Sequence, residues 1–235
     1  MKTIVEGINE AFRLIGALDP EVLEIVFRSL VVSFTAVFFS SLIGLPIAAR
    51  FGQARFRGQR AIELILFNLM SMPTVVIGLV IMLLLSRRGP FGSFGLIYTT
   101  EAMIIAQFIL TLPIVIGLAY DQLKQNGARV LELATTLGAG KGRKTLLLLR
   151  EFTPALAICS ITAFSRAIAE VGAVMIVGGN IRHHTRVLTT AIALNNSMGE
   201  YGMAIALGLI LIVLAFIVNS LIYLLSGKHR EHRRT

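Results

Sequence analysis

The chain has 235 residues, of which 55% are hydrophobic and only 15% are charged, so it lacks the polar surface that a water-soluble globule of this size needs. The formal net charge is +9, but the cations are spread over many loops rather than gathered in one patch, which argues against a nucleic-acid partner.

Four long stretches carry no charged residue, and each is long enough to cross a hydrocarbon core as a helix of roughly 20 residues. A fifth apolar stretch, 152–181, is interrupted by Arg166 and Glu170 alone. The sequence therefore predicts an all-α integral membrane protein with five transmembrane helices in one domain, residues 28–227. The predicted spans are about 28–50, 64–86, 101–120, 152–180 and 201–227.

Lys and Arg alternate between sparse and dense in successive loops. One set of alternate loops holds seven of them and the other holds 14, with Arg166 inside a span. By the positive-inside rule we expect a multi-pass protein of the cell (inner) membrane, with the amino terminus outside and the basic tail, 228–235, in the cytoplasm. Polar residues at Glu6, Asn9 and Glu10 interrupt the apolar run that a cleavable signal peptide would need.

Residues 1–27 precede the first span and are expected on the outer face. Apolar and charged side chains recur there on opposite sides at helical spacing, which predicts an amphipathic interfacial helix. At the end of this segment Asp19 is a predicted N-cap, Pro20 the first helical residue and Glu21 an acid in the first turn. A helix can run from there straight into the first span.

Prolines lie in the predicted spans, and each removes a backbone hydrogen-bond donor. Pro73 and Pro113 predict kinks near a shared cavity, with kinks that only shape packing as the alternative. The one cysteine, Cys159, has no disulfide partner and is interpreted as a packing residue.

The longest cytoplasmic loop, 121–151, predicts two short helices joined by a turn. The first is amphipathic and stops at Gly138 as a C-terminal cap, and the second covers 143–150. The apolar residues of the first are Val130, Leu131, Leu133, Ala134 and Leu137. Such a pair either lies against lipid headgroups as a connector or forms a docking surface for a cytoplasmic partner.

Motifs for catalysis and for cofactors are not found. The string 138–142 resembles a phosphate-binding loop, but glycine follows Lys141 where a hydroxyl is required and no strand precedes it. His183 and His184 lack carboxylate or cysteine companions at ligand spacing, and no nucleophile elbow occurs. We therefore expect no enzyme, no catalytic residue, no metal and no cofactor bound by this chain.

The charged residues of the fourth span are its most informative feature. On a continuous helix Arg166 would lie near mid-membrane, with Glu170 one turn further along the same face, where the two side chains could pair. Two interpretations stay open: a core ion pair that locks the bundle, or a translocation path lined by Arg166 that helps an anion across. Small and polar neighbours, among them Ser165 and Gly172, suit close packing and a path wall equally.

The segment Glu132-Leu133-Ala134-Thr135-Thr136-Leu137-Gly138 resembles the EAA loop of ABC-importer permeases, with Leu133 in place of the middle alanine. Further strings are similar to oxyanion permeases of the molybdate, sulfate and tungstate group. These are Ser29-Leu30, Gly44-Leu45-Pro46, Met72-Pro73-Thr74-Val75-Val76-Ile77-Gly78 and Leu112-Pro113. The segment from Arg166 to Ala173, continued by Met175 to Ile181, looks most like the tungstate-type permease subunit.

The resemblance implies the type I ABC-importer permease fold and a homodimer of five-span subunits. It also implies two separate cytoplasmic ATPase subunits, which carry the ATP and Mg, and an external solute-binding protein that delivers the oxyanion. Glu132, Leu133, Ala134, Thr135, Leu137 and Gly138 would form the coupling loop that docks in the ATPase groove. Tungstate is the expected substrate, with molybdate or sulfate as the alternative within the class.

Alternating access would then be driven by ATP binding to the ATPase subunits, which favours one of two states of the spans. A different class remains open: a proton-coupled secondary transporter that uses Arg166 and Glu170 as a relay. The five spans show no inverted repeat, which counts against it. A passive channel or membrane scaffold would show no dependence on ATP.

Overall fold

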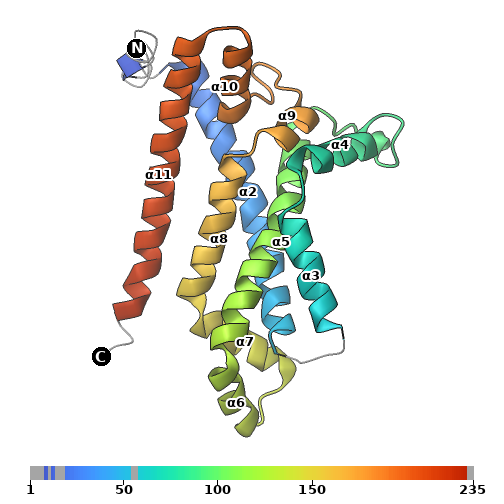
Figure 1. Cartoon of the computed structure of the whole chain (residues 1–235), viewed down its shortest axis with the longest axis vertical. Coiled ribbons are helices and arrows are strands. Elements are labelled where there is room, and N and C mark those ends of the chain that lie inside the picture. Colours follow the sequence, from blue (N-terminus) through green and yellow to red (C-terminus); the bar gives the residue numbers. More distant parts are fainter. Residues whose placement is uncertain (1–7, 10–11, 14–18, 54–57, 232–235) are drawn as a thin grey trace. The chain divides into compact units, whose positions relative to one another are not determined.

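The computed structural model describes residues 8–9, 12–13, 19–53 and 58–231 (Figure 1). All regular structure within these ranges is helical, as the sequence predicts, and no strand occurs in them. Most of the predicted interfacial helix before Asp19 lies outside the described residues, as does the end of the basic tail.

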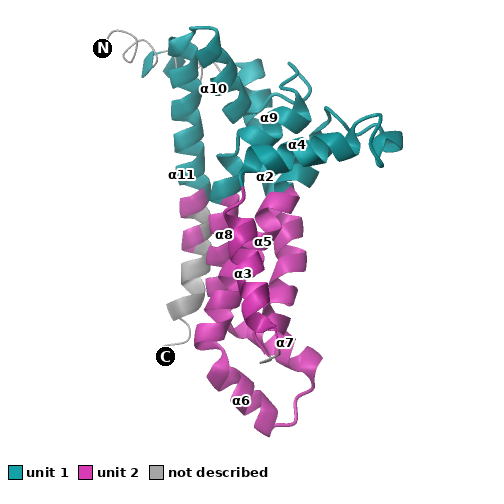
Figure 2. Ribbon diagram, turned by 45° about the vertical axis from the view of Figure 1, so that its right-hand side comes forward, with its two compact units in different colours: residues 1–36, 73–107, 165–218 teal, residues 37–72, 108–164, 219–235 magenta. Residues whose placement is uncertain are grey.

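The chain divides into two compact units, coloured separately in Figure 2. Unit 1 comprises residues 1–36, 73–107 and 165–218, and unit 2 comprises 37–72, 108–164 and 219–235. Four long helices contribute residues to both units: α2 (Pro20–Phe51), α5 (Thr100–Asn126), α8 (Thr153–Ile168) and α11 (Tyr201–Glu231).

The first long helix begins as the sequence predicts. Asp19 Oδ1 accepts hydrogen bonds from the backbone N–H groups of Glu21 (2.9 Å) and Val22 (3.2 Å), two donors that the first turn of a helix leaves without partners. Pro20 is the first helical residue, where its missing N–H costs nothing. The helix α2 then continues for 32 residues without a break, with Pro46 inside it.

Two of the predicted spans are broken. The stretch 64–86 is divided between α3 (Gln59–Met70) and α4 (Thr74–Leu85), which are bent by 90° at the break that holds Pro73. The proline accounts for the break, because the residue before a proline is disfavoured in helical conformation. Pro113, in contrast, lies inside the continuous helix α5.

The predicted fourth span is also interrupted. Helix α8 ends at Ile168, and α9 (Gly172–Gly178) begins after a gap of three residues. Helix α10 (Leu188–Ser197) follows the next loop. By length and composition three described helices could cross a membrane, or up to five if each strongly bent helix pair is one span.

Unit 1 is held together by contacts between short and long helices. Helix α4 packs on α9 so closely that a Cβ atom at Gly78 would lie 2.6 Å from the Cα atom of Ala173. Small residues allow this backbone approach, which is the usual way that helices associate in membranes. A second cluster joins Ile25 of α2 to Leu188 of α10 and Leu207 of α11.

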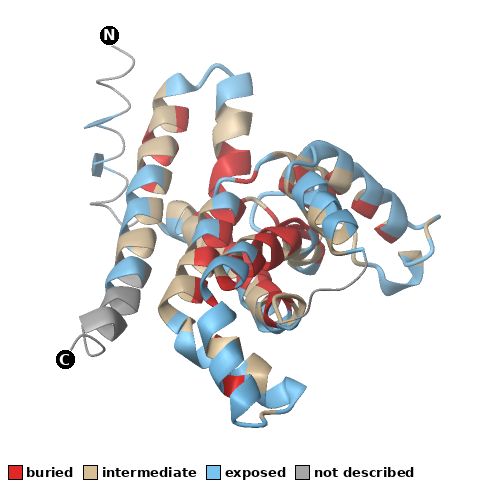
Figure 3. Cartoon of the chain, turned by 60° about the horizontal axis from the view of Figure 1, so that its bottom comes forward, coloured by how far each residue is buried: buried red, intermediate tan, exposed pale blue. Residues whose placement is uncertain are grey.

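Unit 2 has its core along α5. Its buried residues are Ala48, Ala49, Ile116, Ala119, Tyr120, Leu123, Leu148, Leu156 and Cys159, which come from α2, α5, α7 (Lys141–Glu151) and α8. Cys159 is thus a buried packing residue, as expected. In the most apolar part of α5, 61% of the residues are buried, against 22% for α11, the helix that leads to the C label in Figure 3. The core is therefore built on α5, while most described residues of α11 are only partly buried or exposed.

Candidate functional site

The predicted pair of short helices is present in unit 2, as α6 (Ala128–Thr136) and α7. We call α6, α7 and the turn between them the elbow. Gly138 ends α6 with a left-handed φ of 70°, and the N–H of Ala139 donates to the carbonyl of Ala134 (2.9 Å). This is a glycine-dependent helix cap, and it fixes the direction in which the chain leaves α6.

The predicted amphipathic helix is present, but only some of its apolar residues are buried. Ala134 is buried, and Val130 and Leu131 pack against the unit 2 core, but Leu133 and Leu137, which directly follows α6, are 58% and 85% exposed. Because an exposed leucine pair four residues apart gains nothing by facing water, their exposure favours a surface that another protein covers.

The remaining residues of the predicted coupling loop lie beside this leucine pair. Glu132, Thr135 and Gly138 are exposed on the elbow, whereas Ala134 anchors α6 to the core. The side chain of Glu132 is therefore open to the surroundings of the elbow. The structure thus places the acidic Glu132 and the apolar Leu133 and Leu137 together on the exposed surface of the elbow.

A pocket of about 580 Å³ adjoins the elbow within unit 2, and Glu132 is one of its lining residues. Its polar wall is a hydrogen-bonded cluster around Glu63 of α3. Glu63 Oε1 accepts from the hydroxyl of Tyr120 (2.5 Å), from Lys124 Nζ (2.6 Å) and from Gln59 Nε2 (3.1 Å). The cluster ties α3 to the end of α5, two residues before α6 begins.

The predicted ion pair between Arg166 and Glu170 does not form. Because α8 ends at Ile168, Glu170 lies in the break rather than one turn further along a helix. Glu170 is buried, and its Oε1 accepts a hydrogen bond from the N–H of Ala173 (3.1 Å) at the start of α9. Arg166 is exposed and has no hydrogen bond or ion pair with the described part of the chain.

Other unit 1 residues stabilise the break itself. Gln107 Nε2 donates to the carbonyl of Ala167 (2.9 Å), which also accepts a hydrogen bond from the backbone N–H of Glu170 (3.1 Å) at the end of α8. The hydroxyl of Thr189 donates to the carbonyl of Glu170 (2.8 Å). Gly172 opens α9, and a Cβ there would lie 2.7 Å from Val75 Cγ2, so only glycine fits without a shift. Ser165 lies on the last turn of α8.

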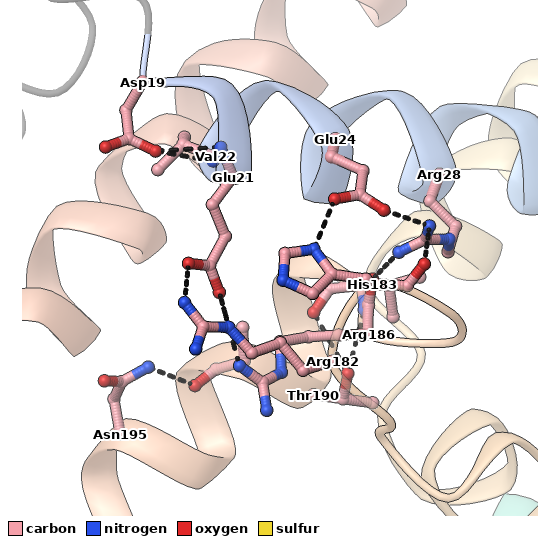
Figure 4. Close-up of polar contacts among 12 residues, drawn as sticks. Asp19, Glu21, Val22, Glu24, Arg28, Arg182, His183, Arg186, Thr190 and Asn195 are labelled. Carbon is pink, nitrogen blue, oxygen red and sulfur yellow. Dashed lines mark hydrogen bonds and ion pairs between the residues drawn. The ribbon is translucent and has the colours of Figure 1, made fainter.

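A cluster of charges joins the loop after α9 to the first turns of α2 (Figure 4). Arg182 contacts both carboxylate oxygens of Glu21, at 2.9 Å and 2.6 Å. Glu24 binds Arg28 (2.6 Å) and His183 Nδ1 (2.9 Å). Glu24 and Arg28 are one helical turn apart, but about 160 residues separate Glu21 from Arg182 and Glu24 from His183, so neither spacing nor periodicity predicts those two contacts.

The electrostatics of this cluster follow from its geometry. Glu21 lies before Arg28, outside the charge-free part of α2, and the hydrogen bond from Arg182 holds the pKa of its carboxyl below the ordinary value of about 4.5. No group of three or more His, Cys, Asp or Glu residues that could hold a metal lies within the described ranges.

Comparison with known proteins identifies the family to which the chain is similar. Residues 40–231 match the family of binding-protein-dependent transport system inner membrane components. The chain is 48% identical over 223 residues to the tungstate uptake system permease protein TupB of Peptoclostridium acidaminophilum, covering 95% of this chain and 98% of that protein. It is 37% identical to the tungstate uptake system permease protein TupB of Campylobacter jejuni, covering 92% of this chain and 90% of that protein.

The molybdenum transport system permease protein ModB of Escherichia coli is more distant. It is 29% identical over 209 residues, covering 85% of this chain and 90% of that protein. The family match extends over more than half of the chain and includes the elbow and both helix breaks. The chain therefore belongs to the family of binding-protein-dependent transport system inner membrane components.

Proposed function

We propose that this chain is the permease subunit of a tungstate uptake system driven by a separate ATPase. The observation that carries the proposal is the 48% identity to a tungstate uptake permease over nearly the whole of both chains, against 29% to a molybdenum permease. The oxyanion-type strings that identify the resemblance include the segment from Arg166 to Ala173, which holds the break between α8 and α9. Molybdate and sulfate are the alternatives within the same class.

In this proposal the elbow is the contact with the ATPase. The exposed Leu133 and Leu137 would enter an apolar groove of that subunit, with Glu132 at the edge of the contact. ATP binding would move the elbow, and the cluster around Glu63 would pass that movement to α3 and α5. The energy of transport comes from the difference in ATP affinity between the two states of the transporter.

The finer assignments rest on charge distribution and on family resemblance. By the positive-inside rule the elbow side, with its 14 cations, would be cytoplasmic, and the loop that holds Arg182 would lie outside, where an external binding protein would deliver the anion. Two copies of this chain would enclose the path, as the resemblance to ABC-importer permeases implies. Neither ATP nor Mg would be bound by this chain.

The coupling assignment is tested by Glu132→Lys in the complete transporter, reconstituted in lipid vesicles. We expect the variant to insert normally but to lose ATP-dependent tungstate uptake and to lose the ATPase on purification. Glu200→Lys is the matched control, since it makes the same charge reversal at an exposed position before α11 and should transport normally. Wild-type uptake by Glu132→Lys would disprove the docking assignment.

The substrate is tested with the cognate binding protein, because substrate choice lies mainly with the subunit that delivers the anion. Uptake of labelled tungstate is measured in competition with molybdate and sulfate. Tungstate should be preferred by at least tenfold. Preference for molybdate or sulfate would replace tungstate by the alternative without affecting the coupling assignment.

A further inference from the structure

The exposed face of α8 has an unusual composition for a helix in a membrane protein. Thr162 and Arg166 are exposed and lie one turn apart on the same side of α8, and Ala169, the first residue after the helix, is also exposed. Each is polar, charged or small. The hydroxyl of Thr162 donates to the carbonyl of Ile158 within the helix (3.0 Å), so it needs no partner from another segment.

The exposed positions of other long helices are quite different. Phe27 and Phe34 of α2 are 69% and 62% exposed, and Ile212 and Phe216 of α11 are 66% and 72% exposed. Large apolar side chains are what a surface in contact with lipid requires, because hydrocarbon offers no hydrogen-bond partner. The face of α8 that bears Arg166 is therefore not built to meet lipid.

The position of Arg166 strengthens this conclusion. It lies 13 residues after the start of α8, about 20 Å along a straight helix, and thus deep in a hydrocarbon core roughly 30 Å thick. A guanidinium at that depth needs water or a counter-charge. Glu170 is turned away to the start of α9, and the described part of unit 1 supplies no other partner for Arg166.

We propose that this face of α8 lines the aqueous translocation path, and that the guanidinium of Arg166 is a binding station for the tetrahedral oxyanion dianion as it crosses. The inference rests on the proposed function, which supplies the anion. A guanidinium presents a planar fork of N–H donors that can contact two oxygens of one anion together. Glu170 accepts a hydrogen bond at the start of α9 instead of pairing with Arg166, so the charge of Arg166 remains available to the anion.

Accessibility to water is tested by cysteine labelling, since Cys159 is the chain's only cysteine. In a Cys159→Ala background, Thr162→Cys and Ala169→Cys leave Arg166 intact, and Phe216→Cys serves as the lipid-facing control. The complete transporter in lipid vesicles is treated with a charged, water-soluble methanethiosulfonate. We expect the cysteines introduced at Thr162 and Ala169 to react at least tenfold faster than the control, and tungstate to slow their reaction. Equal rates at all three positions would overturn the proposal.

The binding station is tested at Arg166 itself. Arg166→Gln should lower tungstate uptake at least tenfold while ATP hydrolysis stimulated by the binding protein continues, and Arg166→Lys should fall between it and wild type. Uptake at the wild-type rate by Arg166→Gln would disprove the station. If Arg166→Gln fails to assemble, the labelling rates at Thr162→Cys and Ala169→Cys decide. Loss of stimulated ATP hydrolysis in Glu132→Lys tests only the contact of the elbow with the ATPase. The proposed function and the anion-binding role of Arg166 can therefore fail independently of each other.

Discussion

The contact between α4 and α9 offers the sharpest test of the packing in unit 1, through Gly78→Ala. A Cβ at Gly78 would lie 2.6 Å from Cα and 3.2 Å from the carbonyl oxygen of Ala173, both backbone atoms that cannot rotate away. Ordinary van der Waals contact begins near 3.4 Å, so the two helices must separate by about 0.8 Å to admit one methyl group.

The expected cost follows from two opposing effects. Overpacking of this kind destabilises by about 1–3 kcal/mol, whereas alanine in place of glycine inside a helix gains up to about 1 kcal/mol. Gly208→Ala in α11 gives the matched control, because a Cβ there meets no atom within 4 Å. The difference in unfolding free energy between the two variants should therefore be about 1–3 kcal/mol, with Gly78→Ala the less stable.

The measurement is thermal unfolding of the purified protein in detergent, followed by circular dichroism. For a chain of this size each kcal/mol corresponds to roughly 2–4 °C in Tm, so Gly78→Ala should melt several degrees below Gly208→Ala. Equal Tm values for the two variants would show that α4 and α9 do not approach each other as closely as the structure has them.

Two further predictions concern the charged clusters. Glu63→Lys and Lys124→Glu should each uncouple ATP hydrolysis from tungstate uptake. The double variant should recover part of the coupling, because it restores the ion pair with its charges exchanged. A double variant that is no better coupled than either single variant would contradict a role for the pair. For Glu21, the lowered pKa means that the contact with Arg182 stabilises the fold above the ordinary carboxyl pKa of about 4.5 and is lost as the pH falls through the lower, folded value. Wild type should therefore lose more thermal stability than Glu21→Gln between pH 6 and pH 3.5, and equal losses would refute the contribution of this contact.

Local signals in the sequence predicted the elements that depend on few neighbouring residues. The cap of α2 at Asp19 and Pro20 and the stop of α6 at Gly138 follow from backbone chemistry within one turn, and both are present. The pattern of charge-free stretches located the apolar segments but not their continuity. A charge-free run indicates that a segment lies in an apolar environment, but it does not show that the helix is continuous. A helix can break there wherever other groups form hydrogen bonds with the backbone N–H and C=O groups that the break leaves without partners.

The errors at the candidate site have the same origin. The prediction that Arg166 pairs with Glu170 assumed that both lie on one continuous helix. The helix is instead broken between them, and the break is stabilised by tertiary contacts of Gln107, Thr189 and Gly172 that the local sequence does not reveal. The spacing of apolar residues in the elbow predicted an amphipathic helix, but it did not predict which of the leucines are buried. Their division between core and surface depends on where the unit 2 core ends, which periodicity does not report.

The separation of Arg166 from Glu170 also argues against the proton relay, one of the two classes of transporter that the sequence left open. A proton relay requires the two groups to exchange a proton directly or through water, so both must face the same space. Glu170 is instead buried and accepts a backbone hydrogen bond from Ala173, while Arg166 is exposed and unpaired within the described part of unit 1. A lone guanidinium can bind an anion but cannot drive it uphill. In the proposed function the driving force enters through a different part of the chain, because the exposed Leu133 and Leu137 of the elbow would give an ATPase a surface on which to act.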